Sequence, residues 1–384
     1  MRYLSLFSGA GGLEHSQIAP VLACERDPAC IRVLSRRLPG IRVHRDVRDL
    51  RPPAVDVVVG GWPCQDVSSA GSMTGISGDR SGLFFTMVDV AIEAGAHSIV
   101  GENVPYLRSI NSGRDFDRLL AHLDRSGFPC ISWRTFNARE FGLAQDRKRI
   151  FVVASRYRQI ARSLHLREPL AVPASAVRAP RTAGFYWTGG GRSICFSRGF
   201  VPALKVGAAD TKGRSVVALF RDGRTWKLSA DGCARPQGFE PSDFQDESKT
   251  DTIRMAGNAV PVPMGRFVLD LVFDPESGDF SRSRTGIQTG FAQVTEHGFV
   301  ESGMVWSVDQ RDTPLANDLD FGRLCHLRLG WRGRQPLCRR HQLRRKSGAM
   351  PIAADFPGIP RQASPPDRSD GDRGLRPRRQ RTRR

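Results

Sequence analysis

Short apolar runs alternate with amphipathic stretches through the first 155 residues, and this alternation limits the possible folds more than any other feature. The apolar runs predict strands, at residues 3–7, 21–24, 55–59, 98–100, 131–133 and 150–153. The amphipathic stretches predict helices, at residues 13–18, 28–38, 83–94 and 116–123. Strands and helices that alternate at this spacing indicate the α/β class, with a doubly wound and mostly parallel sheet.

The composition changes after residue 155. From 156 to about 227, Pro, Gly and Arg become frequent and the apolar runs become short, with Asp222-Gly223 as a candidate hairpin turn. This stretch predicts a small, mainly β domain. A helical pattern returns at 266–271, but beyond about residue 276 no sustained periodicity is found. The segment 276–384 is therefore expected to be a largely disordered extension.

The net charge of +19 is concentrated near the C-terminus. Residues 323–384 contain 18 basic and four acidic side chains, a net charge of +14, which leaves +5 for residues 1–322. A basic protein fits a polyanionic partner, because each Lys or Arg that meets a phosphate releases counterions. A solvated basic tail without a partner is the alternative, so charge alone does not identify a nucleic-acid-binding protein.

Cysteine spacing and hydropathy exclude several classes of protein. The eight cysteines include no C-x-x-C pair and no close Cys/His quartet, so we expect neither a metal site nor a disulfide framework. No apolar stretch approaches the roughly 18 to 20 residues of a membrane helix. The apolar run at residues 3–7 is too short for a signal peptide, which predicts a cytoplasmic protein.

A glycine-rich loop, Phe7-Ser8-Gly9-Ala10-Gly11-Gly12, follows the first predicted strand. Glycines at such a junction let the backbone approach a ligand closely, although an ordinary tight turn has the same composition. Glu25 follows the second predicted strand, where its carboxylate could accept hydrogen bonds from ribose hydroxyls. Together they favour a nucleoside-containing cofactor, while the absence of G-x-G-x-x-G spacing disfavours a hydride-transfer enzyme.

Reactive side chains follow three further predicted strands. Cys64, in Gly60-Gly61-Trp62-Pro63-Cys64-Gln65, is either a nucleophile or a buried structural cysteine. Glu102, in Gly101-Glu102-Asn103-Val104-Pro105, is expected at the same sheet edge, unless it is a surface carboxylate. Gln145, Arg147 and Arg149 alternate, so they share one face of an extended segment and could bind one ligand or form a solvated basic edge.

These motifs, followed by Arg235-Pro236-Gln237-Gly238-Phe239 and Gly257-Asn258-Ala259-Val260-Pro261, closely resemble the C5-cytosine DNA methyltransferases in order and spacing. The resemblance covers residues 1 to about 272, and nothing after about residue 276 is similar to the family. It implies a Rossmann-like catalytic domain over 1–155, completed by 235–275, and a target-recognition domain over 156–234. It also implies S-adenosylmethionine as cofactor.

The resemblance assigns roles to individual residues. Cys64 would add to C6 of a flipped cytosine, Glu102 would exchange a proton at N3, and Arg149, supported by Arg147, would donate to the base. Glu25 would bind the ribose and Asp46 the adenine amino group. The full set expected at the cofactor is Phe7, Gly9, Ala10, Gly11, Gly12, Leu13, Glu25, Asp46, Pro63, Asn258 and Val260. The set expected at the DNA is Gln65, Ser68, Gln145, Arg192, Arg198 and Arg214.

The expected partner is double-stranded DNA, bound by a monomer. A cognate restriction endonuclease in the same cell is a further expectation, with no direct contact to this chain. A transfer-RNA cytosine-C5 methyltransferase shares these catalytic motifs and is one alternative. A catalytically silent DNA-binding relative is another. An enzyme like thymidylate synthase also attacks a pyrimidine C6 with cysteine, but it lacks the glycine loop and a DNA-reading domain.

Overall fold

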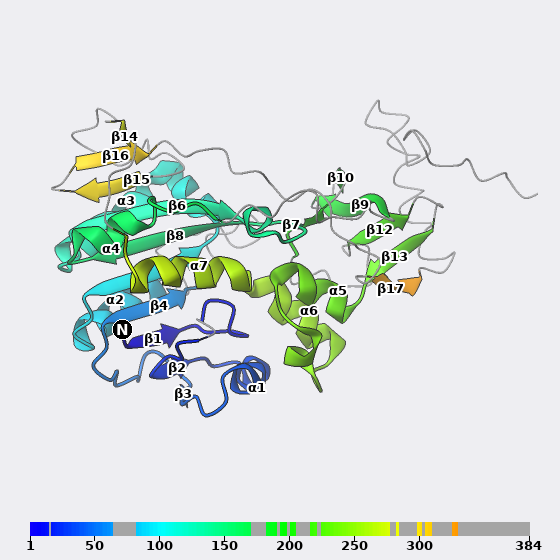
Figure 1. Ribbon diagram of the computed structural model, residues 1–384, viewed down its shortest axis with the longest axis horizontal. Helices are drawn as coiled ribbons and strands as arrows, with labels where there is room; N and C mark the ends of the chain where they lie inside the picture. Colours follow the sequence, from blue (N-terminus) through cyan, green and yellow to red (C-terminus); the bar gives the residue numbers. More distant parts are fainter. Residues whose placement is uncertain are drawn as a thin grey trace, which may run out of the picture.

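The structure is a computed structural model with a large and a small sheet (Figure 1). It describes residues 1–14, 17–63, 82–169, 182–189, 193–197, 200–204, 216–220 and 224–276, and four short strands at 282–283, 298–301, 304–308 and 325–328. Among these residues, no helix is both long and apolar enough to cross a membrane.

The parallel half of the large sheet has the strand order β3-β2-β1-β4-β5. Its strands are β1 Tyr3–Leu6, β2 Leu22–Cys24, β3 Val43–His44, β4 Val57–Gly61 and β5 Ser98–Asn103. All four pairings are parallel. Since β1 lies between β2 and β4, the order reverses beside it, and this confirms the doubly wound prediction.

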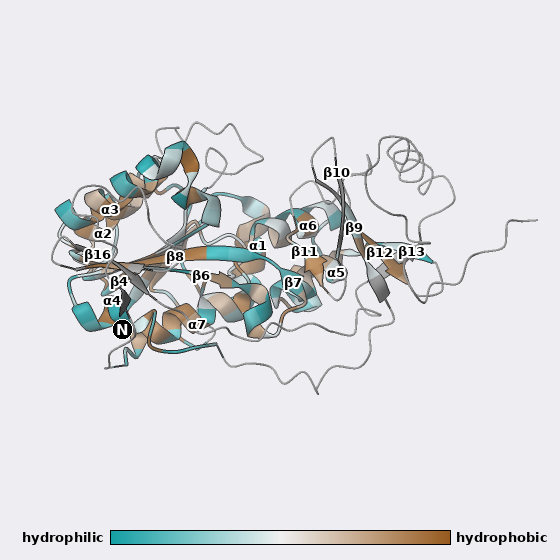
Figure 2. Ribbon diagram, turned by 90° about the horizontal axis from the view of Figure 1, so that it is seen from above, coloured by the Kyte–Doolittle hydropathy of each residue, from teal (hydrophilic) through white to brown (hydrophobic). Residues whose placement is uncertain are grey.

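The sheet changes direction after β5. β8, Lys148–Ser155, pairs antiparallel with β5, and β6, Cys130–Asn137, pairs antiparallel with β8. The sequence analysis did not predict this reversal. Its consequence is that β8 begins at the edge where β5 ends, with Ile150 opposite Asn103. Figure 2 shows that β8 is hydrophobic along most of its length and hydrophilic towards β7.

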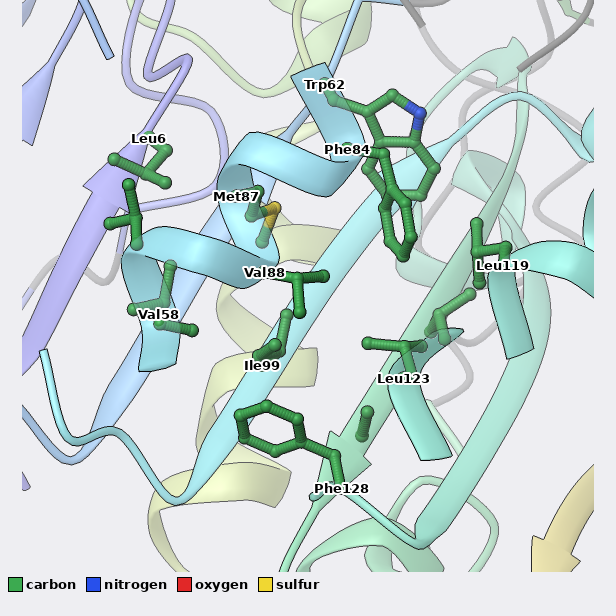
Figure 3. Close-up of a cluster of buried hydrophobic side chains, with 14 of the residues drawn as sticks. Leu6, Val58, Trp62, Phe84, Met87, Val88, Ile99, Leu119, Leu123 and Phe128 are labelled. Atoms are coloured by element: carbon green, nitrogen blue, oxygen red, sulfur yellow. The ribbon is translucent and has the colours of Figure 1, made fainter. Parts of the chain in front are cut away.

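Helices cover both faces of the sheet, because its central strands bury side chains on both sides. On one face α2, Leu83–Glu93, and α3, Arg114–Arg125, pack against the strands. On the other face lie α4, Arg158–Ser163, and α7, Val262–Phe273. Figure 3 shows the first of these cores, with side chains that include Leu6, Val58, Ile99, Phe84, Met87 and Leu123.

The first helix is α1, Pro28–Arg37, as predicted. The Asp27 side chain accepts hydrogen bonds from the Ala29 and Cys30 amides and so caps its N-terminus. The helix predicted at 13–18 is wrong, because the described residues 13, 14, 17 and 18 form bends. The Leu13 amide donates to its neighbour's side chain, Glu14 Oε2, at 3.2 Å, which is a local alternative to helical hydrogen bonds.

Further helices complete the part of the chain that contains the large sheet. The segment after residue 229 forms α5, Ala230–Ala234, and α6, Lys249–Asn258, before α7. Met255 of α6 packs into a core with Val33 of α1. Short 3-10 helices are found at Pro105–Arg108, Ile110–Gly113, Ala138–Phe141, Arg235–Gln237 and Pro241–Phe244.

The small sheet is antiparallel, with the order β10-β9-β12-β13-β17. A separate two-stranded pairing joins β7, Gln145–Asp146, to β11, Val201–Pro202. Val201 and Leu204 are buried in the core of this part with Phe185 and Ala218. The strands of the small sheet are β9 Thr182–Gly189, β10 Ser193–Ser197, β12 Val217–Phe220, β13 Thr225–Leu228 and β17 Cys325–Arg328.

Short strands also occur beyond residue 276, where the sequence analysis expected little order. β15, Gly298–Glu301, pairs antiparallel with β6 and extends the large sheet, followed by β16, Met304–Val308, and β14, Arg282–Ser283. Phe299 and Val300 are buried there. Each run is too short to give a periodic signal. Of these strands, β15 is the one that pairs with β6, and burial of Phe299 and Val300 stabilises it there.

Candidate active site

A cavity of about 670 Å³ opens at the edge where β1, β2, β4 and β5 end. Doubly wound sheets bind ligands at this edge, beside the point where the strand order reverses. The walls come from the glycine loop after β1, the residues after β2 and β3, the ends of β4 and β5, and the segment after α6. Among the lining residues are Phe7, Glu25, Asp46, Pro63, Glu102 and Asn258.

The glycine loop turns sharply as it leaves β1. Gly9 and Gly11 have φ values of +56° and +84°, a region that glycine adopts without strain. Phe7 has φ +54°, which is uncommon for a residue with a side chain. A non-glycine residue held in this region stores strain, and such residues cluster at functional sites. Phe7 is half-buried and lines the cavity.

Glu25 is fixed by two backbone amides. Gly9 donates to Oε2 at 2.8 Å, and Asp27 donates to Oε1 at 2.7 Å. A carboxylate oxygen accepts up to two hydrogen bonds, so each oxygen keeps acceptor capacity for a ligand. The side chain is therefore preorganised on the cavity wall, as an acceptor of hydroxyl groups.

The segment after α6 packs directly on the glycine loop. A Cβ on Gly12 would lie 2.2 Å from the Val260 carbonyl oxygen, and a Cβ on Gly265 would lie 2.5 Å from the Gly12 oxygen. Only glycine fits at these two positions. Asn258 and Val260 thereby become part of the same cavity wall as the loop.

Asp46 lines the cavity on the far side of Glu25. It accepts a hydrogen bond from the Arg48 amide at 3.1 Å, and its other oxygen lies 3.5 Å from the Arg48 guanidinium. The carboxylate is partly exposed and retains acceptor capacity. Val47, which is buried, gives this wall an apolar surface.

Glu14 was missed by the sequence analysis. It is 3% exposed, accepts a hydrogen bond from the Ser5 hydroxyl at 2.6 Å, and lines the cavity. Burial raises the pKa of Glu14, and the hydrogen bond from Ser5 opposes part of that rise. No pattern in the sequence distinguishes this carboxyl from a surface residue, because its burial depends on the loop that folds over it.

Glu102 and Arg149 form a buried ion pair at the opposite end of the cavity. Arg149 Nε lies 2.8 Å from Glu102 Oε1, and the two side chains are 13% and 10% exposed. Burial raises the pKa of Glu102, while Arg149 and then Arg147 act in the opposite direction. The family resemblance implied that Glu102 and Arg149 both act on the target base, and both side chains line the cavity.

Asn103 connects the β5 end to the segment that leads to Cys64, a role that the sequence analysis missed. Its side-chain amide donates to the Trp62 carbonyl at 3.2 Å. The Trp62 ring packs on Phe84 and covers Gly101, where a Cβ would lie 2.7 Å from the ring. Trp62 and Pro63 are thereby fixed beside the cavity.

Arg147 does not line the cavity, unlike Arg149. It is 1% exposed, and its guanidinium donates to the carbonyls of Leu204 at 3.2 Å, Gly257 at 3.0 Å and Ala259 at 2.7 Å. The expectation that Gln145, Arg147 and Arg149 address one ligand is therefore wrong. Gln145 is fully buried beside β11 and is also absent from the cavity lining.

Two described cysteines line the cavity, and neither is suited to act as a nucleophile. Cys24 is 3% exposed, and burial, followed by the nearby Glu25 charge, raises the pKa of its thiol to about 12. Burial also raises the pKa of Cys30. Since the thiolate is the reactive form, both side chains act as small apolar residues.

Ion pairs bind α1 to the segment that precedes the cavity wall. Arg32 and Arg36 both contact Glu247 at 2.6 Å, and Arg37 contacts Asp243 at 2.5 Å. Arg254 pairs with Asp27, at the N-terminus of α1, and lines the cavity. These contacts join residues more than 200 positions apart. They fix residues 243–254 against α1 and its N-terminal cap.

Six of the predicted site residues lie outside the residues that the structure describes: Cys64, Gln65, Ser68, Arg192, Arg198 and Arg214. The last described residue before Cys64 is Pro63, which lines the cavity.

The cavity fits S-adenosylmethionine, the cofactor that the sequence analysis expected. Its volume is in the range of ligand pockets, which is roughly 300 to 1,000 Å³. Glu25 and Asp46 supply acceptors for hydroxyl and amino groups, and Phe7, Val47 and Trp62 supply apolar surface. The close approach of Gly12 to Val260 leaves backbone, without side chains, at this wall.

The contacts of Arg147 give a testable expectation for stability. Arg147→Met removes the hydrogen-bond donor for the carbonyls of three residues. A carbonyl cannot take up a proton to compensate, as a carboxylate can. We therefore expect the free energy of unfolding to fall by about 3 kcal/mol or more. Arg149→Met is the control, with a smaller loss, because Glu102 can take up a proton when its partner is removed. Urea unfolding monitored by tryptophan fluorescence measures both. Equal stability of Arg147→Met and the parent protein would contradict this role.

Known proteins are similar to this chain in sequence. The family model for C-5 cytosine-specific DNA methylase matches residues 1–182. The chain is 32% identical over 306 residues to the Type II methyltransferase M2.BsuMI of Bacillus subtilis (strain 168), covering 72% of this chain and 76% of that protein. It is 29% identical over 314 residues to the Type II methyltransferase M.MthTI of Methanothermobacter thermautotrophicus, covering 69% and 94%.

Two solved structures share the fold. The S. pombe Dnmt2 methyltransferase superposes with a TM-score of 0.53 at 15% identity, over 71% of this chain and 98% of that one. The Entamoeba histolytica methyltransferase EhMeth superposes with a TM-score of 0.52 at 12% identity, over the same shares. With the family match and the 32% identical relative, the fold and the cavity lead to one conclusion. This chain belongs to the C-5 cytosine-specific DNA methylase family.

Proposed function

We propose that this protein transfers a methyl group from S-adenosylmethionine to C5 of a flipped cytosine in a specific duplex DNA sequence, with Cys64 as the nucleophile. The observation that carries the proposal is the Glu102–Arg149 ion pair. It lies at the edge of the cavity that also contains the glycine loop and Pro63, the residue before Cys64. A base that enters beside this pair would have Glu102 as a proton donor and Arg149 as a cation on one side. The part of the cavity beside the glycine loop, proposed for the cofactor, would lie on the other.

The cofactor would lie between the glycine loop and the segment after α6. Glu25, which the Gly9 and Asp27 amides fix, would accept hydrogen bonds from the ribose hydroxyls. Asp46 would accept from the adenine amino group, and Asn258 and Val260 would close the pocket. When bound, S-adenosylmethionine supplies an electrophilic methyl group on its sulfonium, which an activated C5 accepts.

Cys64 would add its sulfur to C6 of the cytosine. The ring is aromatic and electron-poor, and this addition breaks the aromaticity and makes C5 nucleophilic. Asn103 donates to the carbonyl of Trp62, two residues before Cys64 in the sequence, and would thereby help to position the nucleophile. After C5 has taken up the methyl group, its proton would be lost to solvent, the N3 proton would return to Glu102, and departure of the Cys64 sulfur would restore the aromatic ring.

Glu102 would supply a proton to N3 of the ring while the sulfur adds. Because burial raises the pKa of Glu102, the acid form persists to higher pH than for an exposed carboxyl, so a proton is available. Arg149, held beside it at 2.8 Å, would donate to the base and stabilise negative charge that develops on the ring.

The target base must leave the duplex, since C6 is shielded within the stack, and this costs a few kcal/mol. Gln65 and Ser68 are proposed to contact the flipped base from the segment after Cys64. Sequence recognition is proposed for the domain at 156–234, with Arg192, Arg198 and Arg214 as candidates for guanine or phosphate contacts. The named relatives are Type II methyltransferases, which supports a role in restriction–modification.

We further infer that the protein works as a monomer in the cytoplasm, alongside a restriction endonuclease that it does not contact. A methyltransferase of this kind needs only its DNA and cofactor, and one chain contains all of the proposed catalytic residues. The family's description names DNA, so transfer RNA is the less favoured substrate.

Bisulfite sequencing of DNA from cells that express the protein tests the function. We expect 5-methylcytosine at one position of a single recognition sequence, and none with Cys64→Ser, which folds without the nucleophilic thiol. Transfer RNA from the same cells is the control for the alternative substrate. DNA that stays unmethylated while cytosines in transfer RNA are modified would contradict the proposal.

Replacing the proposed acid separates catalysis from binding. With Glu102→Gln we expect kcat to fall about 10²- to 10⁴-fold, because the amide has no proton to transfer, with little change in KM for the cofactor. The kcat of the parent protein should fall as pH rises through the raised pKa of Glu102, and this limb should be absent from the variant. Single-turnover rates with labelled cofactor over pH 5 to 9 measure both.

Glu102→Gln lowers kcat in this scheme, but it should not lower the stability of the fold. Because the folded state raises the pKa of Glu102, ionisation of this group favours the unfolded state as pH rises above its ordinary value of 4.5. Glu102→Gln removes that cost, so its unfolding temperature at pH 8 should equal or exceed that of the parent protein. A clear loss of stability of Glu102→Gln at pH 8 would contradict the conclusion that burial destabilises the ionised form of Glu102.

A further inference from the structure

Gly61 and Glu102 lie side by side at the ends of neighbouring strands. They are Cα partners in the parallel pairing of β4 with β5, so their side-chain positions face the same side of the sheet. A Cβ on Gly61 would lie 2.8 Å from Glu102 Oε2 and 3.9 Å from its carboxyl carbon. The carboxyl group thus occupies the space that a side chain at position 61 would fill.

The two carboxyl oxygens of Glu102 have different surroundings. Oε1 lies 2.8 Å from Arg149 Nε, on the side of β8, whereas Oε2 lies over Gly61, on the side of β4. A cation favours negative charge on the oxygen that it contacts. The proton of the acid form therefore belongs on Oε2, which lies on the side of the strand that continues to Cys64.

We propose that Gly61 is a positioning residue for the methyl transfer, because its bare Cα provides the space in which Glu102 presents Oε2 to the base. This inference rests on the proposed role of Glu102. It adds that glycine is needed at position 61 because the Glu102 carboxyl group occupies the space of a side chain, and not because the backbone adopts a conformation that only glycine allows. Its φ lies outside the left-handed region, so alanine is conformationally allowed there.

The neighbouring glycine has a different constraint. A Cβ on Gly60 would lie 2.9 Å from the backbone oxygen of Leu6 in β1, and 3.3 Å from the Met87 sulfur. A side chain at position 60 must therefore push strands and a helix apart. At position 61 it needs to push only the far end of one side chain. The two glycines therefore form a matched pair of test sites. A side chain at position 60 would disturb the fold, whereas one at position 61 would displace the carboxyl group of Glu102.

Gly61→Ala and Gly60→Ala test the inference together. For Gly61→Ala we expect an unfolding temperature within roughly 2 °C of the parent protein. Its Kd for S-adenosylhomocysteine, measured by calorimetry, should be unchanged. The single-turnover methylation rate should fall about 10²-fold, a loss that a 1 Å misplacement of a catalytic group can cause. Gly60→Ala should lower the unfolding temperature by several degrees.

A shorter acid provides the rescue test. Glu102→Asp withdraws the carboxyl group from position 61 by one methylene. We expect Gly61→Ala to cost about 10²-fold in the parent protein and less than threefold when it is combined with Glu102→Asp. A purely structural role for Gly61 predicts the same cost in both backgrounds.

The outcomes separate this inference from the proposed function. If Gly61→Ala methylates DNA at the parental rate while Glu102→Gln loses activity, Gly61 has no positioning role and the proposed function stands. The inference also fails if Gly61→Ala destabilises the fold as Gly60→Ala does, or if the cost persists with Glu102→Asp. If Glu102→Gln itself keeps the parental rate, the assignment of the acid is wrong.

Discussion

The antiparallel pairing of β8 with β5 is the constraint on which the site depends. In a sheet of parallel strands only, the start of β8 would lie at the opposite edge from the end of β5. Because β8 runs the other way, Arg149 at its beginning meets Glu102 at the end of β5, 2.8 Å from Nε to Oε1. The parallel strands β4 and β5 then bring the residues before Cys64 to the same place. The cation Arg149, the acid Glu102 and the residues that precede Cys64 thus lie at one edge of the sheet.

The second requirement is that the chain returns to its own beginning. The segment after α6 contacts the glycine loop so closely that neither Gly12 nor Gly265 could carry a side chain. Arg147 donates to the carbonyls on either side of Asn258 and to Leu204 in the smaller part. This buried guanidinium therefore connects the cofactor wall with the part of the chain proposed to read DNA. The carbonyl dipoles that accept its hydrogen bonds stabilise the charge of Arg147.

The sequence predicted those features that depend on local patterns and strand ends. Glu25 and Glu102 follow predicted strands, and the strand-end rule for parallel sheets brought these two to one edge. Arg149 begins its strand, and it reaches the same edge only because β8 is antiparallel to β5, which the sequence pattern did not predict. Arg147 was misassigned, because alternation fixes the face of a residue but not the carbonyls it meets, and those lie 57 to 112 positions away. Glu14 and Asn103 were missed for the same reason, since burial and partners come from tertiary packing. The strands beyond residue 276 gave no periodic signal.

Covalent capture on DNA measures whether Cys64 bonds to an extruded cytosine at this edge. A duplex with 5-fluorocytosine at the methylated position blocks the final elimination, because fluorine cannot leave C5 as a proton does. After incubation with cofactor, digestion and peptide mass spectrometry, we expect the base linked to the peptide that contains Cys64, with the methyl group on C5. An adduct on another cysteine, such as Cys24 or Cys30, or no adduct from protein that methylates DNA, would contradict the account.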